Sequence, residues 1–329
     1  MADKKGRILC VDDEPNILRS LTWLLQKEFE VVTASSGQDG LALVRQQDFD
    51  VVISDQRMPG MMGSEFLREV RKLSPRSMRM MLTGYSDLQA MLRSVNDSEV
   101  FRFISKPWKI NELPAVVAEA VYIARHHPVA SAEPDALDAE AGKAPSWTSP
   151  ESILLIDDEA TLAEHLTQEL GSALKVVHAK SIGEAVAAFS DNDIGIVLSD
   201  TRVANVDTTA MLRMLKQEHP EIVTVVYTAG TDAGEVVNLI NQGQIFRFIP
   251  KPVKPAILGL AITAAERKRQ QMRMTPGLAK RYAVEAVDEV AKAAFSENIR
   301  QVAQPSAGTD IPLPFLQRIS GGFRRLFGT

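Results

Sequence analysis

The sequence predicts an α/β protein in which two doubly wound, five-stranded parallel-sheet domains stand in tandem, followed by a partly helical C-terminal tail. Three observations lead to this prediction: an internal repeat, short apolar runs typical of buried strands, and helical periodicity between those runs. The chain has 329 residues, which is long enough for two domains of ordinary size and their connections.

The internal repeat contains no insertion or deletion across its matched blocks. The segment ILCVDDE at Ile8 recurs as ILLIDDE at Ile153, and VVISDQR at Val51 recurs as IVLSDTR at Ile196. A third block, VFRFISKP at residue 100, recurs as IFRFIPKP at residue 245. Every pair is separated by 145 residues, a constant register that indicates two equivalent domains.

Within each repeat, apolar runs alternate with segments of helical spacing. Residues 8–11, 51–53 and 80–82 are continuous apolar runs, the pattern of strands buried on both faces of a parallel sheet. The apolar residues at 17, 21, 24 and 25 recur at helical spacing. Arg102 stands between two apolar residues, and we expect it to face solvent. Alternating strands and helices predict a doubly wound sheet.

Polar side chains of the first repeat stand where its predicted strands end. Asp12 and Asp13 follow the first strand, Asp55 the third, Thr83 the fourth and Lys106 the fifth. The carboxyl ends of the strands in such a sheet form one edge, where the ligand site lies. Clustered carboxylates are hard oxygen ligands suited to Mg²⁺, and a lysine supplies a point charge for a phosphoryl group. We therefore expect a site that stabilises a phosphoryl group being moved to a carboxylate.

These residues resemble the motifs of the response-regulator receiver family, which has a flavodoxin-like fold. The resemblance covers about residues 7–125 and 151–270. It implies that Asp55 accepts a phosphoryl group from a histidine kinase and that the cofactor is Mg²⁺. The implied ligands of the metal are Asp12, Asp13, Asp55 and the backbone carbonyl of Arg57. The other implied roles are a switch hydroxyl at Thr83, a switch aromatic at Phe103, a phosphate-contacting cation at Lys106 and a cis peptide before Pro107.

Each of these residues also has an ordinary structural interpretation. Asp12 and Asp13 could cap the following helix. Thr83 could be a strand-end hydroxyl, Phe103 a core aromatic and Lys106 a solvated surface lysine. The agreement of several elements far apart in the sequence favours the site over these alternatives.

The second repeat carries the same set of groups. The implied acceptor is Asp200, and the implied metal ligands are Asp157, Asp158, Asp200 and the carbonyl of Arg202. The implied switch residues are Thr228 and Phe248, the cation is Lys251, and the cis peptide precedes Pro252. The loop after the acceptor differs, because Arg57-Met58-Pro59-Gly60 becomes Arg202-Val203-Ala204-Asn205. The loss of proline and glycine predicts a different loop backbone beside Asp200.

The domain boundaries follow from the repeat and from composition. We expect a first receiver-like domain at residues 1–125, a flexible linker rich in Ala, Pro and Ser at 126–150, a second domain at 151–272 and a helical or disordered tail at 273–329. The basic run at 267–269 is expected to be a solvated helix end. For the apolar, arginine-bearing end at 315–327, protein docking or disorder is favoured over membrane binding.

Composition excludes several classes of function. A net charge of -5 argues against nucleic-acid binding. The only cysteine, Cys10, lies in an apolar run and is expected to be a buried structural thiol. No stretch approaches the about 20 apolar residues of a membrane span, and the N-terminus has no signal-peptide pattern, so we expect a cytoplasmic protein.

The function expected from the resemblance is that of a two-component response regulator with tandem receivers, which signals by protein–protein contact. Its upstream partner would be a histidine kinase or a histidine phosphotransfer protein, and its downstream protein target is unknown; a homodimer is compatible with the sequence. The alternative is a phosphorelay intermediate or phosphate sink without its own output. Beyond self-catalysed phosphorylation and dephosphorylation, no enzyme is expected. Aspartyl-phosphate phosphatases need a second acid two residues past the nucleophile, where this chain has Arg57 and Arg202.

Overall fold

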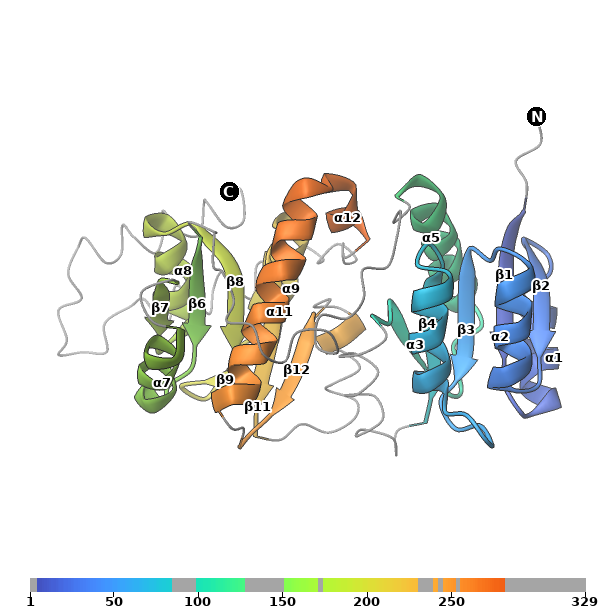
Figure 1. Ribbon diagram of the computed structural model, residues 1–329, viewed down its shortest axis with the longest axis horizontal. Helices are drawn as coiled ribbons and strands as arrows, with labels where there is room; N and C mark the ends of the chain where they lie inside the picture. The colour runs from blue at the N-terminus through green and yellow to red at the C-terminus, as the bar shows by residue number, and fades with distance from the viewer. Residues whose placement is uncertain are drawn as a thin grey trace. The chain divides into compact units, whose positions relative to one another are not determined.

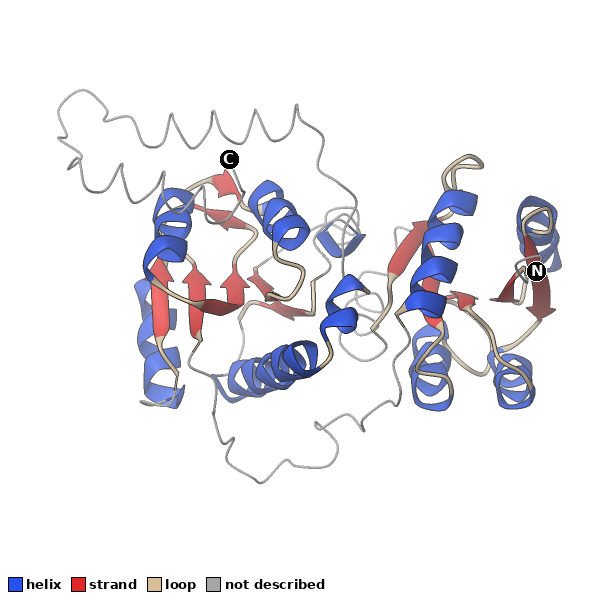
Figure 2. Cartoon of the chain, turned by 90° about the horizontal axis from the view of Figure 1, so that it is seen from above, coloured by secondary structure: helices blue, strands red, loops and turns tan. Residues whose placement is uncertain are grey.

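The computed structural model describes residues 5–84, 99–127, 151–170, 174–229, 239–241, 245–252 and 255–281. The chain forms two compact units, one around each repeat, here called the first unit and the second unit. Each unit holds a parallel sheet with helices along both of its faces (Figure 1, Figure 2). Of the predicted linker at 126–150, residues 128–150 lie outside the described residues, and of the predicted tail at 273–329, residues 282–329 do.

The first unit has the strand order β2-β1-β3-β4-β5, with all neighbours parallel. Its strands are β1 (Gly6–Val11), β2 (Phe29–Ala34), β3 (Val51–Asp55), β4 (Met78–Thr83) and β5 (Arg102–Ser105). Its helices are α1 (Pro15–Leu25), α2 (Gly37–Gln46), α3 (Gly63–Leu73) and α5 (Leu113–His126). The predicted strands and the predicted first helix are therefore confirmed. The strand order reverses between β1 and β3, so the switch point lies between their carboxyl ends.

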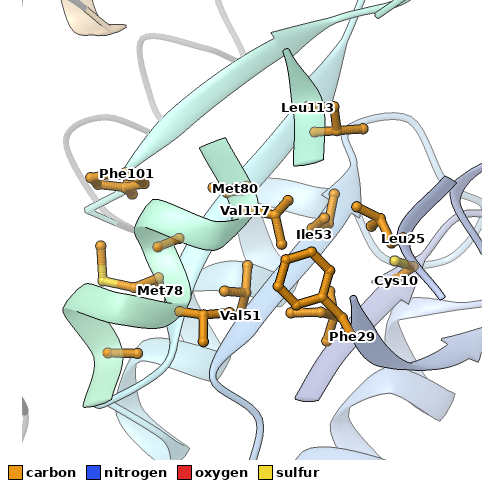
Figure 3. Packing of buried hydrophobic residues seen from close by; sticks show 14 of the residues in the cluster. Cys10, Leu25, Phe29, Val51, Ile53, Met78, Met80, Phe101, Leu113 and Val117 are labelled. Carbon is orange, nitrogen blue, oxygen red and sulfur yellow. The ribbon is translucent and has the colours of Figure 1, made fainter. Parts of the chain in front are cut away.

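Alternate residues of the strands form the core beneath α1 and α5. Ile53 and Val51 of β3 belong to one buried cluster with Leu25 of α1 and Val117 of α5 (Figure 3). Each large apolar side chain buried in this way contributes about 1.5–3 kcal/mol. Helices α2 and α3 cover the opposite face, where Gly40 of α2 allows the Phe66 ring of α3 to approach closely. The rigid sheet between the two layers fixes the strand ends that carry the site.

Cys10 is the last residue but one of β1 and is fully buried. Burial, reinforced by the charge of Asp12, raises the pKa of this thiol to about 12. The thiol therefore stays protonated at neutral pH and is a poor nucleophile. The prediction of a buried structural cysteine is confirmed.

The second unit repeats the arrangement with the strand order β7-β6-β8-β11-β12. Its strands are β6 (Ser152–Ile156), β7 (Val176–Ala179), β8 (Ile194–Ser199), β11 (Val223–Thr228) and β12 (Arg247–Pro250). Its helices are α7 (Ala160–Leu170), α8 (Ile182–Asp191), α9 (Thr209–Glu218), α11 (Pro255–Met274) and the short α12 (Pro276–Lys280). Among the helices described, none is long and apolar enough to cross a membrane.

The loop after the acceptor position of the second unit is a small hairpin. It pairs β9 (Arg202–Val203) with β10 (Val206–Asp207) in antiparallel register. Ala204 and Asn205 connect the two strands with φ angles of 50° and 64°. Positive φ at both central residues is the requirement of the tight turn that matches the twist of a hairpin. The predicted difference in loop backbone is therefore found, and its form is a hairpin.

Arg102 corrects one prediction, because the side chain is buried and does not face solvent. Its residue is 4% exposed. The guanidinium lies 4.2 Å from the centre of the Phe101 ring, and Nη1 donates to the Phe101 carbonyl at 3.1 Å. The planar guanidinium can stack on an aromatic ring, which allows arginine to be buried between apolar neighbours.

The predicted solvated end of α11 is also wrong. Arg269 is 8% exposed and forms a two-point ion pair with Glu151, with Nε to Oε2 at 2.9 Å and Nη2 to Oε1 at 2.7 Å. Its Nη1 also donates to the Glu221 carbonyl at 2.7 Å. Gly195 leaves the space for this pair, since a Cβ there would lie 2.3 Å from Glu151 Oε2. The basic residue therefore joins α11 to the start of β6.

Lys216 of α9 is another buried basic residue. It is 2% exposed, and its Nζ donates to the carbonyls of Pro220 and Ile222 at 2.8 Å and 2.7 Å. Burial lowers the pKa of this amine from 10.5 to about 7, although the charge of Glu221 opposes the change. Between these two pH values the unfolded chain binds a proton that the folded unit does not bind. The free energy of unfolding therefore rises with pH across this window.

We expect Lys216→Met to remove this pH dependence. Between about pH 7 and pH 9, the difference in unfolding free energy, wild type minus variant, should increase by up to about 1.4 kcal/mol per pH unit. This difference is measured by urea unfolding of the full chain, monitored by circular dichroism at several pH values. The contributions of other titrating groups are common to both proteins and cancel. Lys175→Met, at an exposed lysine, is the matched control and should show a flat difference. A flat difference for Lys216→Met would contradict the buried-amine explanation.

Candidate functional site

The carboxyl edge of the first sheet brings together two acids and a lysine from three different strands. Asp12 follows β1 and is fully buried, Asp55 is the last residue of β3, and Lys106 follows β5. Lys106 Nζ lies 2.8 Å from Asp12 Oδ2 and 2.5 Å from Asp55 Oδ1. Residues separated by 94 positions in the chain thus form one charged cluster. This is the convergence that the strand-end pattern predicts.

The electrostatics of Asp55 reflect its position at the edge of a core. Burial raises the pKa of this carboxyl above its ordinary value, even though the Lys106 ammonium acts to lower it. The backbone N–H of Arg57 also donates to Asp55 Oδ2, at 2.6 Å. Burial acts to lower the pKa of Lys106, but its bonds to Asp12 and Asp55 prevail and raise it. The lysine therefore carries a full positive charge beside a carboxylate that is costly to keep ionised.

The predicted switch residues of the first unit lie near this cluster. Thr83 ends β4, and its hydroxyl donates to the Gly84 carbonyl at 3.0 Å. Phe103 lies on the neighbouring strand β5 and is 2% exposed, so its ring is a core aromatic in this structure. The peptide between Lys106 and Pro107 is cis, as expected.

The second unit has the same cluster of two acids and a lysine, but the pKa of its acceptor aspartate is shifted in the other direction. Lys251 Nζ lies 2.8 Å from Asp157 Oδ2 and 2.7 Å from Asp200 Oδ2. Burial acts to raise the pKa of Asp200, but the Lys251 ammonium and the nearby Thr228 hydroxyl prevail and lower it. The two predicted acceptors therefore depart from the ordinary aspartate pKa in opposite directions.

One contact of the second site was not predicted. The ammonium of Lys251 lies 4.8 Å from the centre of the Tyr227 ring, a cation–π contact. The equivalent residue of the first repeat is Leu82, so the departure is visible in the repeat alignment. Phe248 is 2% exposed, and the peptide between Lys251 and Pro252 is cis, as in the first unit.

The oxygen donors at each edge fit Mg²⁺ in their chemistry. Asp13 is exposed beside the buried Asp12, and Arg57 follows Asp55 directly. The second unit repeats this set with an exposed Asp158. In the described part of the chain, no three His, Cys, Asp or Glu side chains are assembled around a cation position. In each unit the lysine ammonium neutralises two of the acids. Carboxylates and a nearby backbone carbonyl are the hard oxygen ligands that Mg²⁺ takes.

Comparison with known proteins gives the same division of the chain. A family model described as the response regulator receiver domain matches residues 8–118 and 153–263. The chain is 40% identical over 121 residues to the hydrogenase transcriptional regulatory protein HoxA of Cupriavidus necator, covering 37% of this chain and 25% of that protein. It is 33% identical over 122 residues to the transcriptional regulatory protein GlrR of Escherichia coli, covering 37% of this chain and 27% of that protein.

Solved structures of single domains are also similar to this chain. The signal receiver domain of an HD domain-containing protein from Pseudomonas fluorescens is 29% identical, with a TM-score of 0.37, and covers 38% of this chain and 93% of its own. A CheY-like receiver domain protein from Methanospirillum hungatei is 31% identical, with a TM-score of 0.36, and covers 37% of this chain and 98% of its own. The chain spans about a quarter of the length of the two curated regulators named above.

Proposed function

Since the chain belongs to the response-regulator receiver family, we propose that it is a two-component response regulator that accepts phosphoryl groups on Asp55 and Asp200. The observation that carries this proposal is the lysine that joins two acids at the same sheet edge in both units. A positive charge held beside a nucleophilic carboxylate stabilises the negative charge of a phosphoryl group during transfer. The upstream donor would be the phosphohistidine of a kinase or of a histidine phosphotransfer protein.

The residues of the first unit have distinct parts in this reaction. A carboxylate oxygen of Asp55 forms a bond to phosphorus as the bond from phosphorus to the donor nitrogen breaks, and the imidazole leaves with that electron pair. Lys106 stays protonated, because its pKa is raised by Asp12 and Asp55 against the effect of burial, and its charge neutralises the phosphoryl oxygens. When bound by Asp12, Asp13, Asp55 and the Arg57 carbonyl, Mg²⁺ would supply further neutralisation of those oxygens.

The output belongs to the proposal as well. We favour signalling by protein–protein contact from a cytoplasmic protein, because the second acceptor site is retained and the net charge of -5 does not favour nucleic acid. The matched segments of the curated relatives cover about a quarter of those proteins, so their regulatory outputs are not carried over to this chain. A phosphorelay intermediate or phosphate sink is the second candidate, favoured by the presence of two complete acid–lysine clusters in one chain.

Labelling with a small phosphodonor in Mg²⁺ tests the proposal. We expect two base-labile phosphates per wild-type chain, one each in Asp55→Asn and Asp200→Asn, and none in the double variant. Asp48→Asn is the matched control, because Asp48 is exposed just before β3 and lies at the opposite end of that strand from Asp55. Undiminished labelling of the double variant would contradict the assignment of Asp55 and Asp200 as the acceptors. Transfer of label from the chain to a histidine phosphotransfer protein would favour the relay over the direct output.

A further inference from the structure

The residue directly after the acceptor differs between the two units and has a different partner in each. In the first unit it is Gln56, whose side chain reaches the start of α3. Its Oε1 accepts from the Ser64 N–H at 3.1 Å, and its Nε2 donates to Ser64 Oγ at 3.4 Å. The Gln56 carbonyl also accepts from the Gly63 N–H at 3.0 Å. Gln56 is therefore occupied in closing the loop and capping α3.

In the second unit Thr208 closes the loop and Asp207 caps the helix. The Thr208 hydroxyl donates to the Asp200 carbonyl at 2.6 Å, and the Thr208 N–H donates to the Thr201 carbonyl at 3.0 Å. Asp207 accepts from the Thr209 N–H at 2.7 Å at the start of α9. The side chain of Thr201, which replaces Gln56, is therefore not needed for the cap.

Thr201 is instead directed at the switch position. Its Oγ1 lies 2.8 Å from the Oγ1 of Thr228 and 3.3 Å from Asp200 Oδ1. Thr228 therefore reaches the Asp200 carboxylate through the Thr201 hydroxyl. The two threonines are 7% and 4% exposed, so their hydroxyls depend on protein partners rather than on bulk water. The two hydroxyls and the carboxylate form a short hydrogen-bonded chain with the Thr201 hydroxyl in the middle.

Counting protons gives the direction of these two hydrogen bonds. Each hydroxyl has one proton, and an ionised carboxylate can only accept. Thr201 therefore donates to Asp200 Oδ1, and Thr228 donates to Thr201 Oγ1. This arrangement fixes the orientation of the Thr228 side chain and holds its hydroxyl close to the acceptor.

The first unit lacks this arrangement. Thr83, the counterpart of Thr228, donates to the Gly84 carbonyl at 3.0 Å. Its neighbour Gln56 is bound to Ser64 and offers the threonine no hydroxyl. To donate to a phosphoryl group on Asp55, the Thr83 hydroxyl must break its bond to Gly84 and rotate.

We propose that Thr201 is a positioning residue that holds the Thr228 hydroxyl beside Asp200 before phosphoryl transfer, so that the second unit accepts phosphate with its switch threonine already in place. The inference rests on the proposed function of Asp200 as an acceptor. A donor whose side chain is already oriented has only its O–H bond to turn when charge develops on the phosphoryl oxygens. The first unit must include that rotation in its response.

The test uses the full chain with Asp55→Asn, so that only Asp200 is labelled by the phosphodonor in Mg²⁺. Thr201→Val keeps the shape and removes the hydroxyl, and we expect the maximal labelling rate to fall by about three- to ten-fold, the value of one net hydrogen bond. The donor concentration at half-maximal rate should not change. Thr201→Ser restores the hydroxyl and should restore the rate. Thr224→Val makes the same replacement at a fully buried threonine of β11, the strand that ends at Thr228, and should leave the rate unchanged.

A labelling rate in Thr201→Val equal to that of its parent would overturn the inference, as would a loss that Thr201→Ser does not restore. A second measurement does not depend on phosphorylation. Three-bond couplings to the Thr228 methyl group in NMR spectra report its χ1 rotamer, which we expect to be single in the wild type and averaged in Thr201→Val. An unchanged rotamer would also overturn it. If Asp200 takes no label while the rotamer responds to Thr201→Val, the proposed acceptor function fails and the positioning role stands.

Discussion

Lys106→Met lowers the rate at which Asp55 is phosphorylated by about 10²-fold, the usual cost of removing one group that stabilises developing charge. Methionine keeps the length and apolar character of the lysine stem but carries no charge. Without the ammonium, the buried Asp12 and Asp55 lose a partner that lies 2.8 Å and 2.5 Å away. Their mutual repulsion then opposes ionisation of Asp55, whose pKa burial already raises.

The rate is measured with a small phosphodonor in the Asp200→Asn background, where Asp55 is the only proposed acceptor. Lys109→Met is the matched control, because this lysine side chain is 76% exposed and pairs with Glu112 at 2.7 Å, away from the acids. We expect the control to keep its rate within about two-fold, as for a surface ion pair of little energetic weight. A rate for Lys106→Met that also stays within this range would remove the lysine from the proposed mechanism.

Arg269→Met destabilises the second unit by about 3–5 kcal/mol, the cost of leaving one partner of a buried ion pair without the other. Glu151 is 8% exposed and holds both of its carboxylate oxygens toward the guanidinium, so it would remain as a buried charge. The Glu221 carbonyl loses its donor in the same substitution. Helix α11 would lose its two close hydrogen bonds to Glu151 at the start of β6 and keep the 3.9 Å ion pair of Arg273.

Urea unfolding distinguishes the two units in a Trp147→Phe background. Trp23 and Trp108 then report the first unit by fluorescence, whereas circular dichroism reports both units. We expect a new early transition in circular dichroism and an unchanged fluorescence transition. Arg273→Met is the matched control: this side chain is 50% exposed and lies 3.9 Å from Glu151, so its loss should cost at most about 1 kcal/mol. Equal effects of the two substitutions would contradict the assigned importance of the buried pair.

The sequence by itself determined the two five-stranded sheets, their parallel strands and the groups that meet at their edges. Continuous apolar runs identify strands that are buried on both faces, and a parallel sheet places all of its carboxyl ends at one edge. Asp12, Asp55 and Lys106 could therefore be brought together from their positions after three runs, and the 145-residue repeat carried the same result to Asp200 and Lys251.

Only the tertiary structure decided how individual polar side chains are satisfied. Arg269 and Lys216 look like ordinary charges on helices, but partners brought close by folding make their burial feasible. The repeat register does not predict these partners: the first unit joins its last helix to the sheet through Arg125 and Asp50, which are not equivalent to Arg269 and Glu151.

The residue after each acceptor shows the same limit at the site itself. Gln56 and Thr201 occupy equivalent positions, and sequence alone does not say which one turns toward the switch threonine. That choice depends on what caps the following helix: Gln56 does so in the first unit, while Thr208 and Asp207 leave Thr201 available in the second. The apolar pattern of the chain determines which elements pack into layers. The partner of a buried polar side chain is the polar group that this packing brings within hydrogen-bond distance, so it is decided only in the folded structure.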